Sequence, residues 1–209
     1  MTTTGRIQTL RASERPATAW LNGGGVTREV AGFPVGAGLD GFEWRVSLAD
    51  VATAGPFSPF PGIDRVITLV EGPGMVLTVD GAEHRIDEPY RPFAFPGDAT
   101  TDCRLLAGPV VDFNVMTRRG EVTAEVALAT APGSASADVP PGGSVLVVCL
   151  AGSVSVDASA DATTDATADV PDATATDLAR YDAALLQHPG SFRLQPDGVT
   201  AVITFRPAT

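Results

Sequence analysis

The chain has 209 residues, 44% of them hydrophobic, which is enough to build a substantial core in one large or two small domains. It carries 14 arginines, no lysine and 25 acidic residues, for a formal net charge of −11. Because so acidic a chain repels phosphate backbones, we expect no nucleic-acid partner. The longest apolar run, residues 145–151, is far shorter than the roughly 20 residues that span a bilayer. The first ten residues contain no apolar signal core, so we expect a cytoplasmic protein with no membrane partner.

Strand signals dominate the first half of the chain. Residues 42–48 alternate apolar and polar side chains with a period of two. Residues 65–70 and 75–79 are rich in β-branched side chains, and a Gly-Pro-Gly turn at 72–74 separates them. An Asp-Gly hairpin signal follows at 80–81. Short runs punctuated by 22 glycines and 17 prolines favour an all-β sandwich or barrel.

The second half repeats this arrangement. Residues 144–150 and 153–156 form an apolar pair around an Ala-Gly turn, and an Asp-Gly pair at 197–198 precedes another apolar run. This repeat predicts two cupin-like barrels (double-stranded β-helices, or jelly rolls) packed as a bicupin. A single irregular sandwich is the alternative.

We place the two predicted barrels on either side of a boundary at residue 120. Residues 1–120 form the N-terminal cupin-like barrel and hold the expected ligand pocket, and residues 121–209 form the C-terminal cupin-like half. The second half includes a low-complexity Ala/Thr/Asp insert at about 157–177. Aspartates recur there every four residues, a spacing that stacks like charges on a helix, so we predict a solvated loop. An acidic calcium site is the alternative, but the insert lacks the EF-hand spacing.

One helix candidate follows the insert. Leu178, Tyr181 and Leu185 lie at helical spacing behind residues that could cap a helix. The same stretch could instead be a turn leading into a strand at residues 183–186.

Cysteine and histidine are too few for a metal site. Cys103, Cys149, His84 and His188 show no zinc-like spacing, and we predict buried free thiols rather than a disulfide. Residues 36–41 match the dinucleotide pattern G-x-G-x-x-G, but a strand rather than a helix follows them. We therefore expect no metal and no cofactor.

The most informative region is a cluster of polar side chains among aromatics and glycines at residues 20–65. Arginine presents a planar fork that can bind a carboxylate through two hydrogen bonds, and Arg45 and Arg65 are suited to this role. Aromatic walls with a few convergent polar groups are typical of small-ligand pockets. The alternative is that these arginines pair structurally with Asp64, Glu29 or Asp112.

Four motifs in this order and spacing resemble the HutD/Ves family. They are WLNGGGVTRE at 20–29, FEWRVSLA at 42–49, GPFSPFPGIDR at 55–65 and VDFNVMTRRG at 111–120. The resemblance is good over residues 5–120, whereas the second half matches mainly in its strand layout.

The resemblance implies a two-barrel cupin fold without a catalytic metal and no established enzymatic activity. It implies a cytoplasmic regulator that restrains histidine utilisation by binding a carboxylate intermediate of the pathway, such as urocanate or N-formylglutamate. The side chains that it assigns to the ligand are Trp20, Asn22, Thr27, Glu29, Arg45, Ser58, Arg65 and Asn114. Those expected to orient or support them are Trp44, Ser47, Asp64 and Asp112.

An enzyme that uses the same pocket is the alternative function. A metal-independent isomerase or hydrolase of a small carboxylic acid would need a titratable group, and Glu29 is the first candidate before Asp64 and Asp112. A homodimer formed through an exposed sheet edge is a further prediction.

Overall fold

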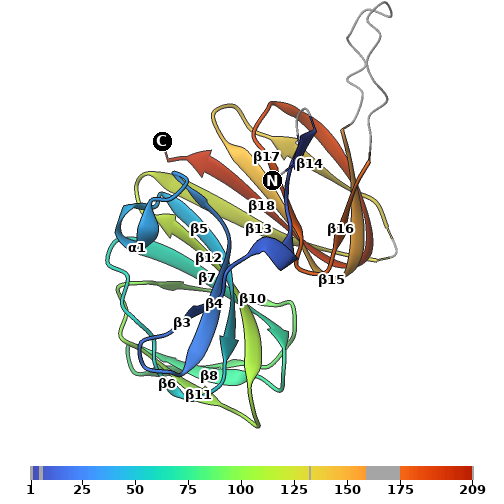
Figure 1. Cartoon of the computed structure of the whole chain (residues 1–209). Coiled ribbons are helices and arrows are strands. Elements are labelled where there is room, and N and C mark those ends of the chain that lie inside the picture. Colours follow the sequence, from blue (N-terminus) through green and yellow to red (C-terminus); the bar gives the residue numbers. More distant parts are fainter. Residues whose placement is uncertain (1, 5–6, 132, 159–174, 209) are drawn as a thin grey trace, which may run out of the picture. The chain divides into compact units, whose positions relative to one another are not determined.

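The computed structural model describes residues 2–4, 7–131, 133–158 and 175–208, and the regular secondary structure of these residues is nearly all strand (Figure 1). The helical elements among these residues are the single turn α1 (Gly38–Gly41) and a 3-10 turn (Ala12–Glu14). The expected all-β fold class is therefore confirmed, whereas the packing of two barrels as a bicupin stays a prediction.

The chain divides into two compact units. The N-terminal unit comprises residues 15–123 together with Ala208, and the C-terminal unit comprises residues 124–207 together with the first fourteen residues. The division after residue 123 lies close to the predicted boundary at 120. The assignment of the first fourteen residues to the C-terminal unit differs from the prediction, because nothing local in the sequence reveals a pairing with distant strands.

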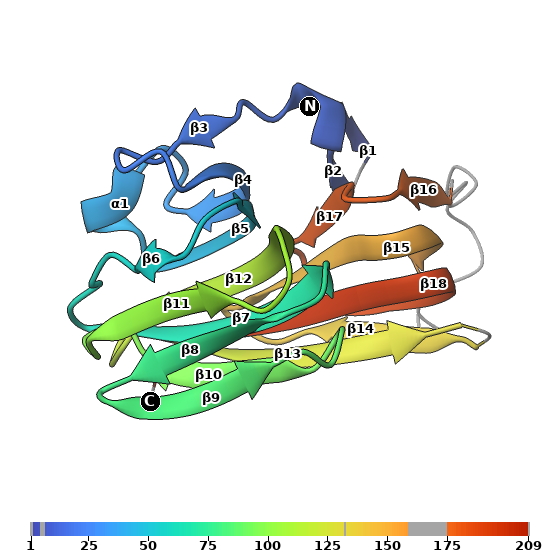
Figure 2. The same cartoon turned by 90° about the horizontal axis from the view of Figure 1, so that it is seen from below.

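The N-terminal unit contains two antiparallel sheets (Figure 2), and a hydrophobic core cluster lies between them. The larger sheet has the order β10-β7-β12-β5-β4-β3, and the smaller has the order β6-β11-β8-β9. The larger sheet is formed by β3 (Thr18–Ala19), β4 (Gly25–Phe33), β5 (Trp44–Val51), β7 (Ile63–Glu71), β10 (Pro92–Pro96) and β12 (Val110–Arg118). The smaller sheet is formed by β6 (Gly55–Pro56), β8 (Met75–Val79), β9 (Ala82–Ile86) and β11 (Thr101–Leu105).

The core of this unit lies between the two sheets. Ile67 and Leu69 of the larger sheet pack in one cluster with Met75 and Leu77 of the smaller. The predicted hairpin is confirmed, since β8 pairs with β9 around Asp80-Gly81. Both turn residues have positive φ, 46° and 85°, the conformation of the two-residue turn that matches strand twist.

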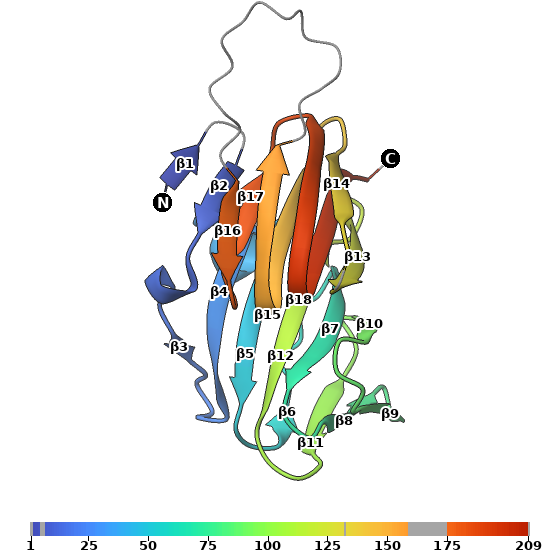
Figure 3. The ribbon, with the colours of Figure 1, turned by 90° about the vertical axis from the view of Figure 1, so that its right-hand side faces the viewer.

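The C-terminal unit contains one sheet of eight strands with the order β1-β2-β17-β15-β18-β13, to which β14 adds on β18 and β16 on β15 (Figure 3). Its strands are β1 (Thr2–Thr4), β2 (Ile7–Leu10), β13 (Val122–Thr130), β14 (Ala135–Val139), β15 (Ser144–Ala158), β16 (Thr176–Ala179), β17 (Ala183–Leu186) and β18 (Gly190–Pro207). The two long strands β15 and β18 pair with each other along most of their length, and apolar side chains such as Val147, Phe192 and Leu194 form the core.

The predicted turn at Ala151-Gly152 is wrong. The strand β15 continues through it, and Gly152 pairs with Gly198 in the equally continuous β18. A Cβ atom on Gly152 would clash with the Asp197 carbonyl, and the residue has a φ of 72°. These glycines therefore allow two long strands to approach closely at an irregular register step, a role that β-bulges commonly give to glycine.

The helix candidate after the insert is also wrong, and its strand alternative at residues 183–186 is confirmed. Residues 176–179 and 183–186 form β16 and β17, because pairing with β15 prevails over a short helical spacing. Tyr181 lies in the intervening turn with a φ of 66°. The first two residues of the predicted insert belong to β15 and the last two to β16; residues 159–174 lie outside the described residues.

Candidate functional site

The predicted polar residues gather on the face of the larger sheet that is turned toward the smaller one, here called the inner face. Side chains alternate along each strand, so Arg65 shares this face with the core residue Ile67. The register continues the face across neighbouring strands, because Met116 lies opposite both Arg65 and Arg45. The inner face therefore carries Thr27, Glu29, Arg45, Ser47, Arg65, Asp112 and Asn114.

Arg65 is the centre of this group. It is only 6% exposed, and its Nη2 donates a hydrogen bond of 2.8 Å to Asn114 Oδ1. Its guanidinium carbon lies 5.3, 5.6 and 4.9 Å from the ring centroids of Phe57, Phe60 and Phe95, within the range of cation–π contacts. Its enclosed Nε finds no hydrogen-bond partner among the described residues. Arg65 is thus a buried cation whose Nε–H donor has no acceptor among the described residues.

Asp112 completes a buried polar chain. Asn114 Nδ2 donates to Asp112 Oδ1, while Oδ2 has no partner within the described part of the chain. Burial raises the pKa of Asp112 to about 7, although the charge of Arg65 opposes this rise. Burial also lowers the pKa of Arg65 to about 10, so the guanidinium keeps its charge at neutral pH. Near pH 7, Arg65 is therefore fully charged, whereas the carboxyl of Asp112 is partly protonated.

A second arginine lies nearer to solvent. The Nε of Arg45 donates to Glu29 Oε2 at 2.6 Å, and the two side chains are 12% and 52% exposed. Because β12 separates β5 from β7, the backbones that carry Arg45 and Arg65 are two strand spacings apart, about 10 Å. The positive charge of Arg45 also contributes to the lowered pKa of Arg65, after burial.

Trp20 and Thr27 extend the inner face toward the edge of the sheet. Trp20 Nε1 donates to Thr27 Oγ1 at 2.7 Å, and both side chains are half-buried. The Trp20 ring meets Phe57 edge to face at 6.4 Å. Ser47 is buried between Glu29 and Asn114 in the register of the sheet.

The structure does not bring Trp44 and Asp64 to this group. Each is the chain neighbour of an inner-face arginine, so strand alternation turns it to the opposite face. Trp44 stacks on Phe33 with the ring centroids 6.4 Å apart. Asp64 pairs with Arg119 rather than with Arg45 or Arg65.

Asn22 and Ser58 lie in exposed loops. The Oδ1 of Asn22 accepts a hydrogen bond of 2.9 Å from the Gly24 amide, which is the geometry of an Asx turn. Its contact thus organises the turn before β4. Ser58 sits between Phe57 and Phe60 in the loop that covers Arg65.

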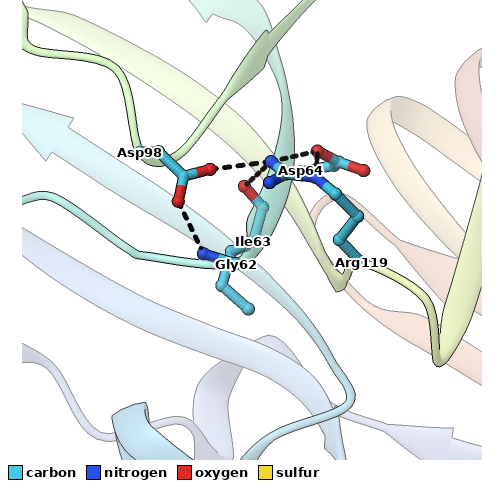
Figure 4. A network of polar contacts seen from close by, with 5 residues as sticks. All are labelled: Gly62, Ile63, Asp64, Asp98 and Arg119. Carbon is cyan, nitrogen blue, oxygen red and sulfur yellow. Dashed lines mark hydrogen bonds and ion pairs between the residues drawn. The ribbon is translucent and has the colours of Figure 1, made fainter.

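Sequence reasoning missed a charged network beside this loop (Figure 4). Arg119 donates to Asp64 Oδ1 through Nε and Nη2, at 2.9 and 2.7 Å, and through Nη2 to Asp98 Oδ2 at 2.8 Å. Asp98 Oδ1 in turn accepts from the Gly62 amide at 2.8 Å. The sequence signal for this network was the pair Arg118-Arg119 near the end of the fourth motif. That pair does not indicate that Asp64 and Asp98 are its partners.

A hollow of about 520 Å³ lies in the C-terminal unit, along β13, β14 and β18. Its lining is rich in alanine, and the charged side chains that border it, Glu125, Asp138 and Arg206, are all exposed. Among the described residues, no buried charge faces it. The candidate site therefore remains on the inner face of the N-terminal unit.

The two thiols lie inside the fold, whereas His188 is exposed. Cys103 and Cys149 are free and buried, and burial raises the pKa values of their thiols to about 12 and about 11. His84 packs against Phe93 with the ring centroids 4.7 Å apart. The described part of the chain groups no three His, Cys, Asp or Glu side chains that could hold a metal ion. In the same residues, no helix has the length and apolar character needed to cross a membrane.

The fold and the inner face define an all-β, cupin-like protein with a buried cationic site. The HutD family model matches residues 12–204. Because that match spans most of the chain, the chain belongs to the HutD family. Solved structures near 10% identity share the fold alone.

Two sequence relatives each match about half of the chain. An uncharacterized 21.2 kDa protein in the hutC 3′ region of Pseudomonas putida is 46% identical over 111 residues, which span 53% of this chain and 58% of the relative. Protein Ves of Citrobacter koseri is 41% identical over 116 residues, which span 54% of this chain and 59% of the relative. These alignments thus span less than two thirds of either relative.

A solved structure matches the whole chain. HutD from Pseudomonas fluorescens SBW25, described as a formate condition, is 31% identical with a TM-score of 0.77. The match covers 97% of this chain and 100% of that one. The resemblance to the HutD/Ves family is therefore confirmed.

Proposed function

We propose that the protein is a non-enzymatic, cytoplasmic small-molecule-binding protein that holds a small carboxylate on the inner face of the N-terminal unit. The observation that carries this proposal is Arg65, a buried guanidinium under three aromatic rings whose enclosed Nε has no partner among the described residues. A buried donor without an acceptor is costly, and a carboxylate oxygen is the acceptor that suits arginine best.

The local charge supports an anion as the ligand. Two guanidiniums, Arg45 and Arg65, face Glu29 and an Asp112 carboxyl whose pKa lies near 7. Within a protein of net charge −11, this inner face therefore carries excess positive charge at neutral pH. A bound carboxylate would neutralise the excess, and Asn114 and Thr27 would supply directed hydrogen bonds.

We further propose that the bound carboxylate is an intermediate of histidine utilisation, urocanate or N-formylglutamate, and that binding restrains the pathway. Membership of the HutD family and similarity to a protein from a hutC 3′ region support this role. The formate condition of the related HutD structure is consistent with a carboxylate ligand. Assembly as a homodimer stays a prediction.

A thermal-shift and calorimetric titration with matched ligands tests the proposal. Urocanate, N-formylglutamate and formate are compared with formamide, which has the size of formate but no charge. A ligand at about 100 times its dissociation constant stabilises by roughly 2.7 kcal/mol, enough to resolve. We expect the carboxylates to bind and formamide not to bind.

Two arginine variants connect binding to the site. Arg65→Gln should weaken binding about tenfold or more, since a charge-assisted hydrogen bond contributes about 1.5–3 kcal/mol. Arg45→Gln, at a more exposed position, keeps the test valid if the buried variant does not fold. Arg91→Gln is the matched control, because it removes an exposed ion pair with Glu88. Equal carboxylate affinity in all three variants would rule out the inner-face site.

A metal-independent isomerase or hydrolase of a small carboxylic acid is the second candidate function. Asp112 favours it, because a buried carboxyl with a pKa near 7 is suited to proton transfer. Glu29, the first choice from sequence, is half-exposed and paired with Arg45. Turnover of urocanate or N-formylglutamate that Asp112→Asn abolishes would favour the enzyme; binding without turnover would favour the binding protein.

A further inference from the structure

The loop at residues 57–62 covers Arg65 with two aromatic rings, and its two ends are held by different means. At the first end, the Phe57 amide donates to the Thr101 carbonyl of β11 at 2.9 Å. This bond continues the pairing of β6 with β11. At the second end, Phe60 contacts the turn between β10 and β11 instead. The positions of the two rings therefore depend on separate contacts.

The Phe60 end is joined to that turn by an unusually close approach. The Phe60 amide donates to the Gly97 carbonyl at 2.8 Å, and the Gly97 amide donates to the Ile63 carbonyl at 2.7 Å. A Cβ atom on Gly97 would lie 2.7 Å from the Phe60 oxygen and 2.8 Å from the Ile63 oxygen. Only glycine therefore allows the two segments to lie so close.

Charged side chains span the same junction (Figure 4). Arg119, just after β12, binds Asp64 of β7 and Asp98 of the β10–β11 turn, and Asp98 also accepts from the Gly62 amide. The Arg119 amide donates to the Gly62 carbonyl at 2.9 Å. We call the three charged residues the Arg119 clamp. They connect three elements where the loop enters β7, at the strand position before Arg65.

The charges of the clamp stabilise one another. The Gly62 amide and then Arg119 lower the pKa of Asp98, and Asp64 and Asp98 raise the pKa of Arg119. All three side chains are about half-exposed, and an isolated surface pair of this kind contributes little to global stability. A network that connects three segments can nevertheless fix the local position of a loop.

We propose that Arg119 and Asp98 are positioning residues that hold Phe60 over Arg65 and so set the affinity of the inner face for its anion. The part that concerns the ligand rests on the proposed function. Release of the clamp lets Phe60 move away from the guanidinium, and water then reaches Arg65 and competes with the anion. The Phe57 ring stays in place, because β11 holds it independently.

The first experiment needs no ligand. The side-chain Nε–H resonance of Arg65 is recorded by NMR in the wild-type protein and in the variants Arg119→Gln and Asp98→Asn. We expect the ring-current shift of this proton to decrease and its exchange with water to accelerate in both variants. Arg119→Lys, which keeps the charge but loses the fork, should give an intermediate result. Arg91→Gln, which removes an exposed pair outside the loop, should leave the resonance unchanged.

The second experiment measures formate affinity in the same proteins. We expect a loss of about three- to thirtyfold in Arg119→Gln and Asp98→Asn, the range of one cation–π contact. An unchanged Arg65 resonance would overturn the proposal. A changed resonance with unaltered formate affinity would overturn the effect of the clamp on binding. If the wild-type protein binds no carboxylate while the resonance still moves, the proposed function fails and the positioning role stands.

Discussion

The buried Asp112 makes the stability of the protein depend on pH in a way that one substitution should remove. Its pKa is raised from an ordinary value of 3.8 to about 7 in the folded chain, chiefly because burial disfavours the ionised form. Between pH 3.8 and pH 7 the folded state therefore binds more protons than the unfolded state. The favourable contribution of Asp112 is therefore complete below pH 3.8 and is lost as the pH rises through 7.

The magnitude follows from the size of the shift. A difference of about three pKa units corresponds to roughly 4 kcal/mol, of which about 3 kcal/mol is lost between pH 5 and pH 9. Asp112→Asn keeps an oxygen that can accept the Asn114 hydrogen bond and removes the titrating charge. We therefore expect the stability of this variant relative to wild type to rise by about 3 kcal/mol from pH 5 to pH 9.

Urea unfolding at pH 5, 7 and 9 measures this difference. Asp102→Asn is the matched control, since Asp102 is exposed on β11 and its variant should follow the wild-type pH profile. If the gap between wild type and Asp112→Asn is the same at all three pH values, Asp112 is not a buried group with a raised pKa, and the electrostatic account of the inner face is refuted.

Three further predictions concern the C-terminal unit and the thiols. Gly152→Ala should destabilise the chain by about 3 kcal/mol or more, because its Cβ would clash with the Asp197 carbonyl at positive φ; circular dichroism melts would show a lower midpoint. Asp182→Ala should release β2, since this carboxylate accepts hydrogen bonds from the amide of Ala12 and from an arginine beside β2. Faster amide exchange confined to β2 would bear this out, and unchanged exchange would contradict it. Cys103 and Cys149 should resist alkylation at pH 8 until the chain unfolds, since burial raises both thiol pKa values; rapid labelling of the native protein would show that they are accessible.

The strands and the candidate residues of the inner face could be predicted from the sequence for different reasons. Alternation and turn signals depend only on neighbouring residues, so the hairpin of β8 and β9 was predictable. Arg45, Arg65 and Asn114 were found because they belong to motifs that resemble a family. Strand alternation, if applied more strictly, would also have placed Trp44 and Asp64 on the opposite face, since each adjoins an inner-face arginine.

What the sequence could not predict depends on contacts between distant residues. Arg119 and Asp98 meet across 21 positions, and neither lies in a local pattern that specifies the other. Gly152 and Gly198 read as turn residues, because a glycine that permits a turn and a glycine that permits close strand approach are locally identical. The pairing of β2 with β17 has no local signal at all.

That last pairing has a consequence for how the chain is made. Arg11 and Asp182, which join the start of the chain to the β17 region, are 171 positions apart. At about 5–20 residues per second, a ribosome needs roughly 10–30 s between them. Throughout that interval β2 has been synthesised but its partner β17 has not. Residues 15–123 meanwhile emerge as a continuous segment that contains both sheets of the N-terminal unit. The N-terminal unit can therefore complete its strand pairing during synthesis, whereas the sheet of the C-terminal unit must wait for its last strands.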